Sequence, residues 1–180
     1  MQLAQNRKLT VLCLLLFLCW ASAAAAATRV YFNPPLPGEQ RVAAYIAEAI
    51  NGVAPGGEIL VQEYQFDEPS ILQALMAAQK RGVRVCCLFD KTVGDAAETL
   101  KNAGITVGFD PVHIAHNKVL IIDRRLVIGG SFNLTVHANT HNCENCVFID
   151  DPAVVRRFVQ NFQARVKNVP LTVRFYNEMK

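Results

Sequence analysis

The sequence predicts an α/β fold, namely an α/β/α sandwich whose central sheet is mixed and largely parallel. Between residues 29 and 109, short apolar runs typical of strands alternate with segments whose apolar residues recur at helical spacing. Such β-α-β connections favour parallel strands with helices on both faces of the sheet. Two further apolar runs flank a polar Asp-Arg-Arg at residues 123–125, which predicts a hairpin that adds antiparallel strands. No repeat or linker divides the 180 residues, so a single domain is expected.

The first strand is expected at Arg29–Phe32, where an apolar run ends at a proline-rich segment. A helix follows and ends at Gly52, because apolar residues recur three or four positions apart: Val42, Tyr45, Ile46, Ala49 and Ile50. After a Pro-Gly-Gly loop, Glu58–Phe66 is predicted to form the second strand. These three elements make the first β-α-β unit of the predicted sandwich.

A second helix is predicted to begin at Glu68-Pro69, since proline suits the first helical turn, and to end before Gly82. Its apolar stripe consists of Ile71, Leu72, Leu75 and Met76. Val83–Phe89 is apolar throughout most of its length, which is typical of a strand buried on both faces. Ala96–Asn102 is expected to be a short helix, and Ile105–Phe109 a fourth strand.

The hairpin is predicted from Lys118–Ile122 and Leu126–Ile128, and its second strand ends at Gly129-Gly130. Val147–Ile149 is a further predicted strand. Asp151-Pro152 then opens a long helix with one apolar face, made of Val155, Phe158, Phe162 and Val166.

The hairpin carries the most specific pattern in the chain, H-x-K-x4-D-x6-G-S-x-N. Its polar members are His116, Lys118, Asp123, Ser131 and Asn133. Because the second strand runs back along the first, Ser131 and Asn133 should return to the end of the hairpin that holds His116 and Lys118. Asp123 should lie at the opposite end.

These residue types suit phosphoryl transfer. An imidazole can act as nucleophile or general acid near neutral pH, and Lys118 offers a point positive charge to a phosphate oxygen. Ser131 and Asn133 offer neutral donors to oxygens that gain charge in the transition state. His116 and Lys118 are two positions apart, so on a strand they share a face. A lone H-x-K would indicate an ordinary surface hairpin, but the full pattern in a strand-turn-strand context favours a catalytic site.

The chain resembles the phospholipase D superfamily at all six positions of its H-K-D and G-S-x-N signature. It is similar to the small branch with one motif copy, the secreted Nuc-like bacterial endonucleases that cut DNA and RNA without a metal. The flanking similarity runs from about Val30 to about Val166. It includes Tyr64-Gln65-Phe66, Ala74-Leu75, Lys80-Arg81-Gly82-Val83 and Glu144-Asn145. The resemblance implies the same α/β/α sandwich and no cofactor.

The resemblance also implies a two-step mechanism, in which His116 attacks phosphorus and forms a covalent phosphohistidine. A second histidine protonates the leaving oxygen and then activates water to release the product. Since the chain has one motif copy, the second histidine is expected from a second chain in a two-fold homodimer.

Two acidic residues receive different expected roles. In the resembling nucleases a Glu-Asn pair places its carboxylate beside the active site, so Glu144 is expected to orient the catalytic side chains. Without the resemblance, an exposed glutamate at a strand edge would be preferred. Asp123 is expected to be mainly structural, either capping the turn or pairing with Arg124 or Arg125.

A metal site is the weaker interpretation of a second cluster. His137 and His141 are four positions apart and Cys143-x-x-Cys146 could form a two-ligand arm, but the arms are too close for a standard zinc finger. We therefore expect no metal ligands. His113 is expected to be a surface histidine.

The first 27 residues have the form of a secretory signal peptide. Arg7 and Lys8 precede the apolar run Leu9–Trp20, and small residues follow up to an expected cleavage near Ala27. An uncleaved anchor is the alternative, although the run is short for a membrane span. A single nuclease domain at residues 28–180 is therefore expected in the periplasm or outside the cell, without stable membrane association.

Cleavage would remove two basic residues and no acidic ones, lowering the net charge from +3 to +1. A basic surface for nucleic acid must then be local. Candidates are Lys80-Arg81 with Arg84, Lys118, Arg124-Arg125 and Arg156-Arg157.

Four cysteines remain after cleavage, an even number in an oxidising compartment: Cys86, Cys87, Cys143 and Cys146. They allow three full pairings, among which the sequence does not choose. The adjacent Cys86 and Cys87 should point to opposite faces of a strand, and at least one should be a buried apolar residue.

The sequence thus predicts a secreted phosphodiesterase whose substrate is nucleic acid, DNA and RNA. The alternative is a phosphodiesterase of phospholipid or cardiolipin that uses the same residues. The lack of a basic amphipathic helix makes that alternative weaker. An inactive binding module is the third interpretation, and the intact motif argues against it.

Overall fold

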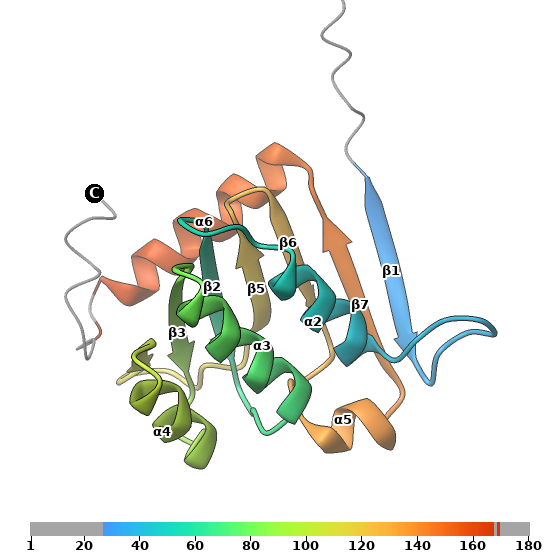
Figure 1. Cartoon of the computed structure of the whole chain (residues 1–180), viewed down its shortest axis with the longest axis horizontal. Coiled ribbons are helices and arrows are strands. Elements are labelled where there is room, and N and C mark those ends of the chain that lie inside the picture. Colours follow the sequence, from blue (N-terminus) through green and yellow to red (C-terminus); the bar gives the residue numbers. More distant parts are fainter. Residues whose placement is uncertain (1–26, 168, 170–180) are drawn as a thin grey trace, which may run out of the picture.

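The structure, a computed structural model, describes residues 27–167 and 169. They form a seven-stranded sheet between two layers of helices (Figure 1). The strands are β1 Thr28–Asn33, β2 Glu58–Glu63, β3 Arg84–Phe89, β4 Thr106–Phe109, β5 Lys118–Ile122, β6 Leu126–Gly130 and β7 Glu144–Ile149. The helices are α2 Val42–Asn51, α3 Pro69–Lys80, α4 Asp95–Asn102, α5 Val136–Thr140 and α6 Pro152–Val166. Almost all of the expected signal peptide, residues 1–26, lies outside the described residues.

The predicted mixed sheet is confirmed, with the strand order β1-β7-β6-β5-β2-β3-β4. β2, β3 and β4 are parallel neighbours, as their helical connections predict. All other neighbouring pairs are antiparallel, because β5 and β7 run against the remaining described strands. β1 is the main departure from expectation. It lies at the far edge beside β7 instead of next to β2, so fewer neighbours are parallel than the sequence indicates.

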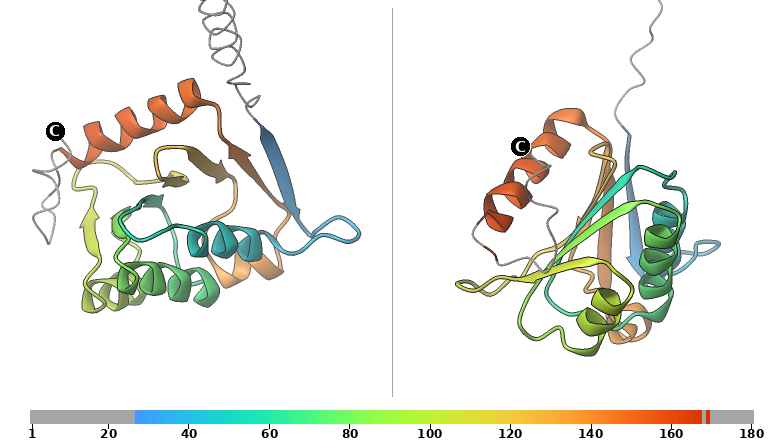
Figure 2. Two further views of the ribbon diagram at one scale, coloured as in Figure 1. Left: turned by 45° about the horizontal axis from the view of Figure 1, so that its top comes forward. Right: turned by 60° about the vertical axis from the view of Figure 1, so that its left-hand side comes forward.

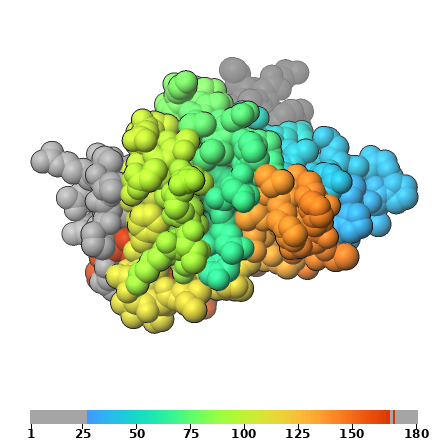
Figure 3. All heavy atoms as spheres, turned by 90° about the horizontal axis from the view of Figure 1, so that it is seen from below, coloured from blue at the N-terminus to red at the C-terminus, as the bar shows by residue number. Residues whose placement is uncertain are grey.

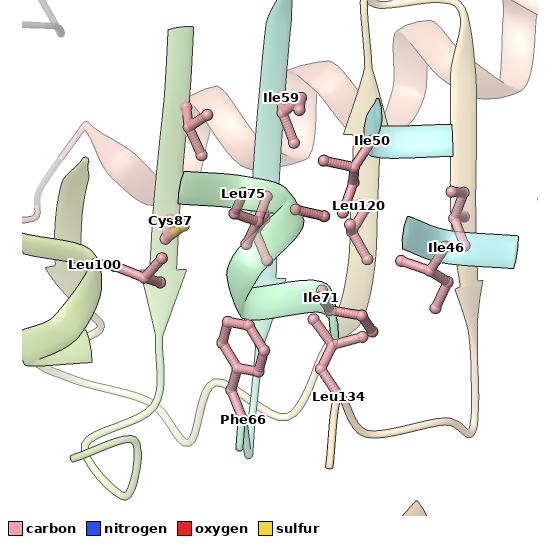
Figure 4. Close-up of a cluster of buried hydrophobic side chains, with 14 of the residues drawn as sticks. Ile46, Ile50, Ile59, Phe66, Ile71, Leu75, Cys87, Leu100, Leu120 and Leu134 are labelled. Atoms are coloured by element: carbon pink, nitrogen blue, oxygen red, sulfur yellow. The ribbon is translucent and has the colours of Figure 1, made fainter. Parts of the chain in front are cut away.

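The two helical layers cover opposite faces of the sheet (Figure 2). Side chains alternate along each strand, so Ile59 and Val61 of β2 pack toward α2 and α3 while Leu60 packs toward α6. Figure 4 shows the larger core, in which side chains of α2, α3 and α4 meet those of the sheet. Both cores contain fully buried aliphatic or aromatic residues, such as Leu75 on one side and Phe162 on the other. The sheet is therefore packed against helices on both faces.

Helix ends follow the local signals of the sequence. Pro69 and Pro152 stand in the first turns of α3 and α6. Asp151 accepts hydrogen bonds from the backbone N–H groups of Ala153 and Val154, at 2.7 and 2.9 Å, and so caps α6. Gly82 follows α3 with a φ of 87°, the left-handed conformation predicted there.

The cysteines are all free among the described residues. Cys86 and Cys87 are both fully buried, and they face opposite cores, as their adjacent positions in β3 predict. Cys146 is buried in β7, while Cys143 is exposed in the preceding loop.

Candidate active site

The motif lies at one end of the sheet, where β5 begins and β6 ends. β5 and β6 pair in the predicted hairpin, with Val119 opposite Gly129. His116 precedes β5 in the loop from β4, and Ser131 follows β6 directly. In Figure 1 this is the lower end of the sheet, and Figure 3 views the molecule from that side. The predicted return of Ser131 to the end that holds Lys118 is confirmed.

The exposed His116 forms one group with the half-buried Lys118 and Tyr64. The Lys118 amine donates a hydrogen bond of 2.9 Å to the His116 carbonyl oxygen, and it lies 3.3 and 3.4 Å from the two ring nitrogens of His116. The Tyr64 ring lies 4.5 Å from the His116 ring, between centroids, and 5.0 Å from the Lys118 amine. Tyr64 follows the end of β2, whose last residue Glu63 pairs with Lys118. A tyrosine ring thus positions both the imidazole and the cation.

The loop that carries His116 is held by two buried carboxylates. Asp90, after β3, accepts a 2.9 Å hydrogen bond from the Ala115 N–H. Asp110 accepts bonds from the N–H groups of Val112 and His113, at 3.0 and 2.9 Å. Burial raises the pKa of each carboxyl, but the backbone hydrogen bonds outweigh it, so both pKa values lie below the ordinary range. His116 therefore lies on a loop that is held in place by hydrogen bonds to Asp90 and Asp110.

Ser131 and Glu144 form a second group beside the first. The Ser131 hydroxyl donates to Glu144 Oε2, and the Asn142 amide donates to Glu144 Oε1 at 2.8 Å. The Asn145 N–H in turn donates to the Ser131 hydroxyl oxygen at 3.1 Å. Gly130 is needed here, because a Cβ would collide with the backbone carbonyl of Asn145 on β7. Glu144 is half-buried and engaged on both oxygens, unlike a free glutamate at a strand edge.

The charge of Lys118 depends on its surroundings. Partial burial lowers the pKa of its amine, while the carboxyl groups of Glu63 and Glu144 act in the opposite direction. Glu63 is fully buried directly beneath the site, and burial raises the pKa of its carboxyl well above the ordinary range. Its Oε1 accepts a 2.8 Å bond from the Tyr64 N–H, and its Oε2 has no partner within the described chain. Burial thus favours the protonated form of Glu63, in which its carboxyl attracts the Lys118 amine less strongly.

Asn133 lies apart from this group, in the wall of a neighbouring pocket of about 570 Å³. No hydrogen bond joins its side chain to His116 or Lys118 in the described part of the chain, and its Oδ1 is buried without a partner. Its loop is fixed to the segment after β2 by a bridge between Phe66 and Leu134 and by a 3.0 Å bond from the Asp67 N–H to the Leu134 carbonyl.

Asp123 lies at the far end of β5, as predicted from the hairpin. Its Oδ1 accepts a 2.8 Å bond from the Glu58 N–H, and its φ is 50°. Arg124 follows with a φ of 51° and pairs with Glu58 at 2.8 Å. The Asp123 side chain thus joins the β5-β6 turn to the start of β2, remote from His116, and the expected pairing with Arg124 is replaced by a pairing of Arg124 with Glu58.

The cluster considered for a metal does not assemble. His137 and His141 stack with 5.1 Å between ring centroids, but Cys146 is buried in the sheet. No group of three or more metal-ligating side chains occurs in residues 27–167 and 169. His113 is exposed and lies 3.8 Å from Asp110.

Several site residues have no signal in the motif itself. Glu63 ends β2 and Tyr64 follows it. Their position beside the motif depends on the pairing of β2 with β5, which the sequence does not reveal. Tyr64 belongs to the flanking similarity, which assigns it no role. Asp90 and Asp110 follow β3 and β4, so the carboxyl ends of parallel strands again supply the polar groups.

The protein has a mixed sheet between two helical layers, and its central hairpin carries H-x-K and G-S-x-N at one end. This combination defines a phospholipase D-like domain. The chain belongs to this family: the family model described as "Cardiolipin synthase, PLD-like domain" matches residues 46–166.

Individual relatives agree with this assignment. The chain is 43% identical over 112 residues to a phospholipase D of Rickettsia typhi, a match that covers 59% of this chain and 55% of that protein. It therefore spans about half the length of that curated relative. A mitochondrial cardiolipin hydrolase of Xenopus laevis is 29% identical over 150 residues, covering 80% of this chain and 70% of the relative. Among solved structures, Nuc of Salmonella typhimurium, a phospholipase D family member, is 32% identical with a TM-score of 0.73, covering 81% of this chain and 97% of Nuc.

Proposed function

We propose that this protein is a secreted, metal-independent phosphodiesterase that hydrolyses DNA and RNA through a phosphohistidine intermediate. The observation that carries the proposal is the exposed His116 imidazole, whose nitrogens lie 3.3 and 3.4 Å from the Lys118 amine. A nucleophile beside a cation is the arrangement that attack on a phosphodiester requires. The likeness to Nuc and the resemblance to single-motif endonucleases support nucleic acid as the substrate.

The chemistry follows in two displacements. A His116 nitrogen attacks phosphorus, forming a P–N bond as the bond to the leaving oxygen breaks, and a second histidine gives that oxygen a proton. The same histidine then takes a proton from water, which attacks phosphorus and breaks the P–N bond. Lys118 neutralises the phosphate oxygens, and Ser131 with Glu144 holds the end of β6 in position. Histidine supplies both nucleophile and acid, so this mechanism needs no metal ion.

We place the second histidine in a second copy of the chain. The face of β1 and β7 that α6 leaves uncovered is apolar, with Val30 and Phe32 exposed at 43% and 38%. Val30 pairs with Val147, and a groove of about 320 Å³ runs from Val147 to Lys118. An apolar face that adjoins the site suits an isologous interface, which would bring two His116 side chains together.

The localisation is proposed from the sequence. Residues 1–27 have the form of a cleavable signal peptide, so the domain at residues 28–180 is proposed to act in the periplasm or outside the cell. No helix among the described residues is long and apolar enough to cross a membrane.

A phospholipid phosphodiesterase is the second candidate. The relatives named phospholipase D and cardiolipin hydrolase favour it. So does the loop before His116, where Val112 and Ile114 are exposed at 77% and 72% and offer an apolar tip to a lipid surface.

The test is digestion of plasmid DNA, RNA and phosphatidylcholine vesicles side by side, each with and without excess EDTA. We expect nucleic acid to be cut at an unchanged rate in EDTA, and His116→Ala to be inactive. Loss of cleavage in EDTA and recovery with added zinc or magnesium would contradict the histidine mechanism. Cleavage of the vesicles alone would establish the second candidate instead.

A further inference from the structure

The pocket beside Asn133 has no part in the two displacements described above. It has a volume of about 570 Å³, within the range of small-molecule sites. Its floor is apolar, with Phe66 and Leu72, and its walls carry amides and hydroxyls, among them Gln65, Asn133 and Thr99. The segments that contribute these residues, coloured teal, yellow-green and orange, lie side by side on the face shown in Figure 3. A pocket of this size and lining, next to the motif, is suited to bind a ligand.

We propose that this pocket binds the base of a nucleotide next to the phosphate being cut. The inference rests on the proposed nuclease function and extends it from phosphate chemistry to base contacts. No lysine or arginine lines the pocket and His137 is its one basic residue, so a second phosphate would find no permanent positive charge there. A nucleic-acid base is a flat, uncharged ring with polar edges. Its face could pack on the apolar floor of the pocket, and its edges could hydrogen-bond to the amides of the walls.

Two amides in the pocket have unused hydrogen-bonding capacity. Gln65 is exposed and its side chain makes no hydrogen bond to any described residue, whereas Asn133 Oδ1 is buried without a partner. The three hydroxyls are already engaged: Thr92 donates to the Tyr64 carbonyl at 2.9 Å, Thr99 donates to the Asp95 carbonyl at 2.8 Å, and Thr135 accepts from the Ala138 N–H at 3.0 Å. An amide offers a donor and an acceptor together, which is the pattern on the edge of a base. The free capacity is therefore of the kind that a base would use.

Two residues of the pocket also adjoin the residues around His116 along the chain. Gln65 follows Tyr64, whose ring contacts His116. Asn133 belongs to the G-S-x-N segment, which begins where Ser131 meets Glu144. A strand whose phosphate lies over His116 and Lys118 would therefore bring an adjoining base over Gln65 and Asn133.

A cationic lipid headgroup is the competing occupant, because Asp67 and Asp95 also line the pocket. Asp67 Oδ1 is already used by the Val136 N–H, at 2.7 Å. Phe66 is buried and is the one phenylalanine, tyrosine or tryptophan in the lining, so the cage of such rings typical of quaternary ammonium sites is missing from this pocket. The base is the better match.

The test compares four small substrates of the full-length protein. They are a dinucleotide with one phosphodiester, the same compound with either base removed, and the compound with both bases removed. We expect one of the two singly abasic compounds to show a kcat/KM about 5- to 150-fold below that of the dinucleotide, the range expected for base contacts. Equal kcat/KM for all four compounds, with DNA still cut, would overturn the base pocket and leave the nuclease intact.

Two variants assign the effect to the pocket. Gln65→Ala removes the free amide, and Thr99→Leu narrows the pocket from an exposed helix position. Both should lower kcat/KM for the dinucleotide and leave the doubly abasic compound unchanged, whereas Gln160→Ala on α6 should change neither. If only phosphatidylcholine is cut and Asp95→Asn raises its KM, the nuclease proposal fails and the headgroup is the occupant. If DNA is cut but neither pocket variant affects the dinucleotide, the base lies elsewhere.

Discussion

Glu63 is the residue whose chemistry depends most on the fold. Its carboxyl has zero exposure, and its pKa is raised by burial against the opposing effects of backbone hydrogen bonds and Lys118. The folded protein thus keeps a proton that the unfolded chain loses above about pH 4.3. Because the folded state binds more protons, the free energy of unfolding contributed by Glu63 falls as pH rises from that value toward the raised pKa.

Glu63→Gln should remove this dependence, since glutamine mimics the neutral acid and keeps the acceptor for the Tyr64 N–H. We expect the variant to gain stability relative to wild type as pH rises from about 4 to about 8, measured by urea unfolding. Glu48→Gln makes the same chemical change on the exposed surface of α2 and should give a difference without this rising trend. Parallel curves for Glu63→Gln and wild type would show that Glu63 is ionised in the folded state.

Tyr64 should matter through its ring. Contacts between a cation and an aromatic face contribute about 0.5–2 kcal/mol, which corresponds to about 2- to 30-fold in rate. We expect Tyr64→Ala to lower kcat/KM on DNA within that range, because the Lys118 amine and the His116 ring lose their common support. Tyr64→Phe keeps the ring and should remain within about twofold. Equal losses in the two variants would point to the hydroxyl instead.

The β5-β6 turn gives Asp123, a residue of the motif, a structural role. Asp123 and Arg124 have φ values of 50° and 51°, a conformation that aspartate and asparagine tolerate better than alanine. Asp123→Ala loses both this tolerance and the bond from the Glu58 N–H, so we expect the free energy of unfolding to fall by about 1–3 kcal/mol. The activity per folded molecule should change little, because His116 lies at the other end of β5.

Asp123→Asn is the matched control, since it keeps the acceptor oxygen and the tolerance for positive φ. It should be clearly more stable than Asp123→Ala in the same thermal unfolding experiment. A large loss of kcat in a folded Asp123→Asn variant would mean that the aspartate has a chemical role.

Elements with strong local patterns were predictable, and those that depend on distant partners were not. The apolar stripes of α2, α3 and α6 and the hairpin were predicted to within a few residues, because each pattern lies in one stretch of chain. Helix α5 was missed, since five residues give no apolar period and only the Thr135 cap marks its start. β2 was predicted to reach Phe66 but ends at Glu63, because β5 begins opposite that residue.

The candidate site was predictable only for residues that lie within the motif. The motif placed His116, Lys118 and Ser131 at one end of the hairpin, and it separated Asp123 from them. Glu63 and Asp90 could not be found in the same way, because their place depends on which strands become neighbours. Asn133 belongs to the motif by sequence, yet its side chain faces the neighbouring pocket.

At the scale of the whole molecule, the proposed sharing of one active site between two chains predicts that activity depends on pairs of chains. A heterodimer of wild type and His116→Ala would hold one histidine and lack its counterpart, which costs about 10²- to 10⁴-fold. Refolding the two chains together at varied ratios should therefore give activity proportional to the square of the wild-type fraction. Mixtures of wild type with Gln160→Ala should keep constant activity at every ratio. A linear dependence on the wild-type fraction, or full activity from a proven monomer, would exclude the composite site.

The pairing of β1 with β7 affects how the domain is made. β1 is the first described strand to be synthesised, yet its partner is the last strand of the sheet, separated from it by almost the whole domain. Closing such a long loop is slow, because the entropy of the intervening chain opposes the contact until most of the core exists. A nascent chain therefore cannot complete this sheet until nearly all of it has been translated. Under the export that we propose for this protein, the delay would keep the polypeptide unfolded while it crosses the membrane.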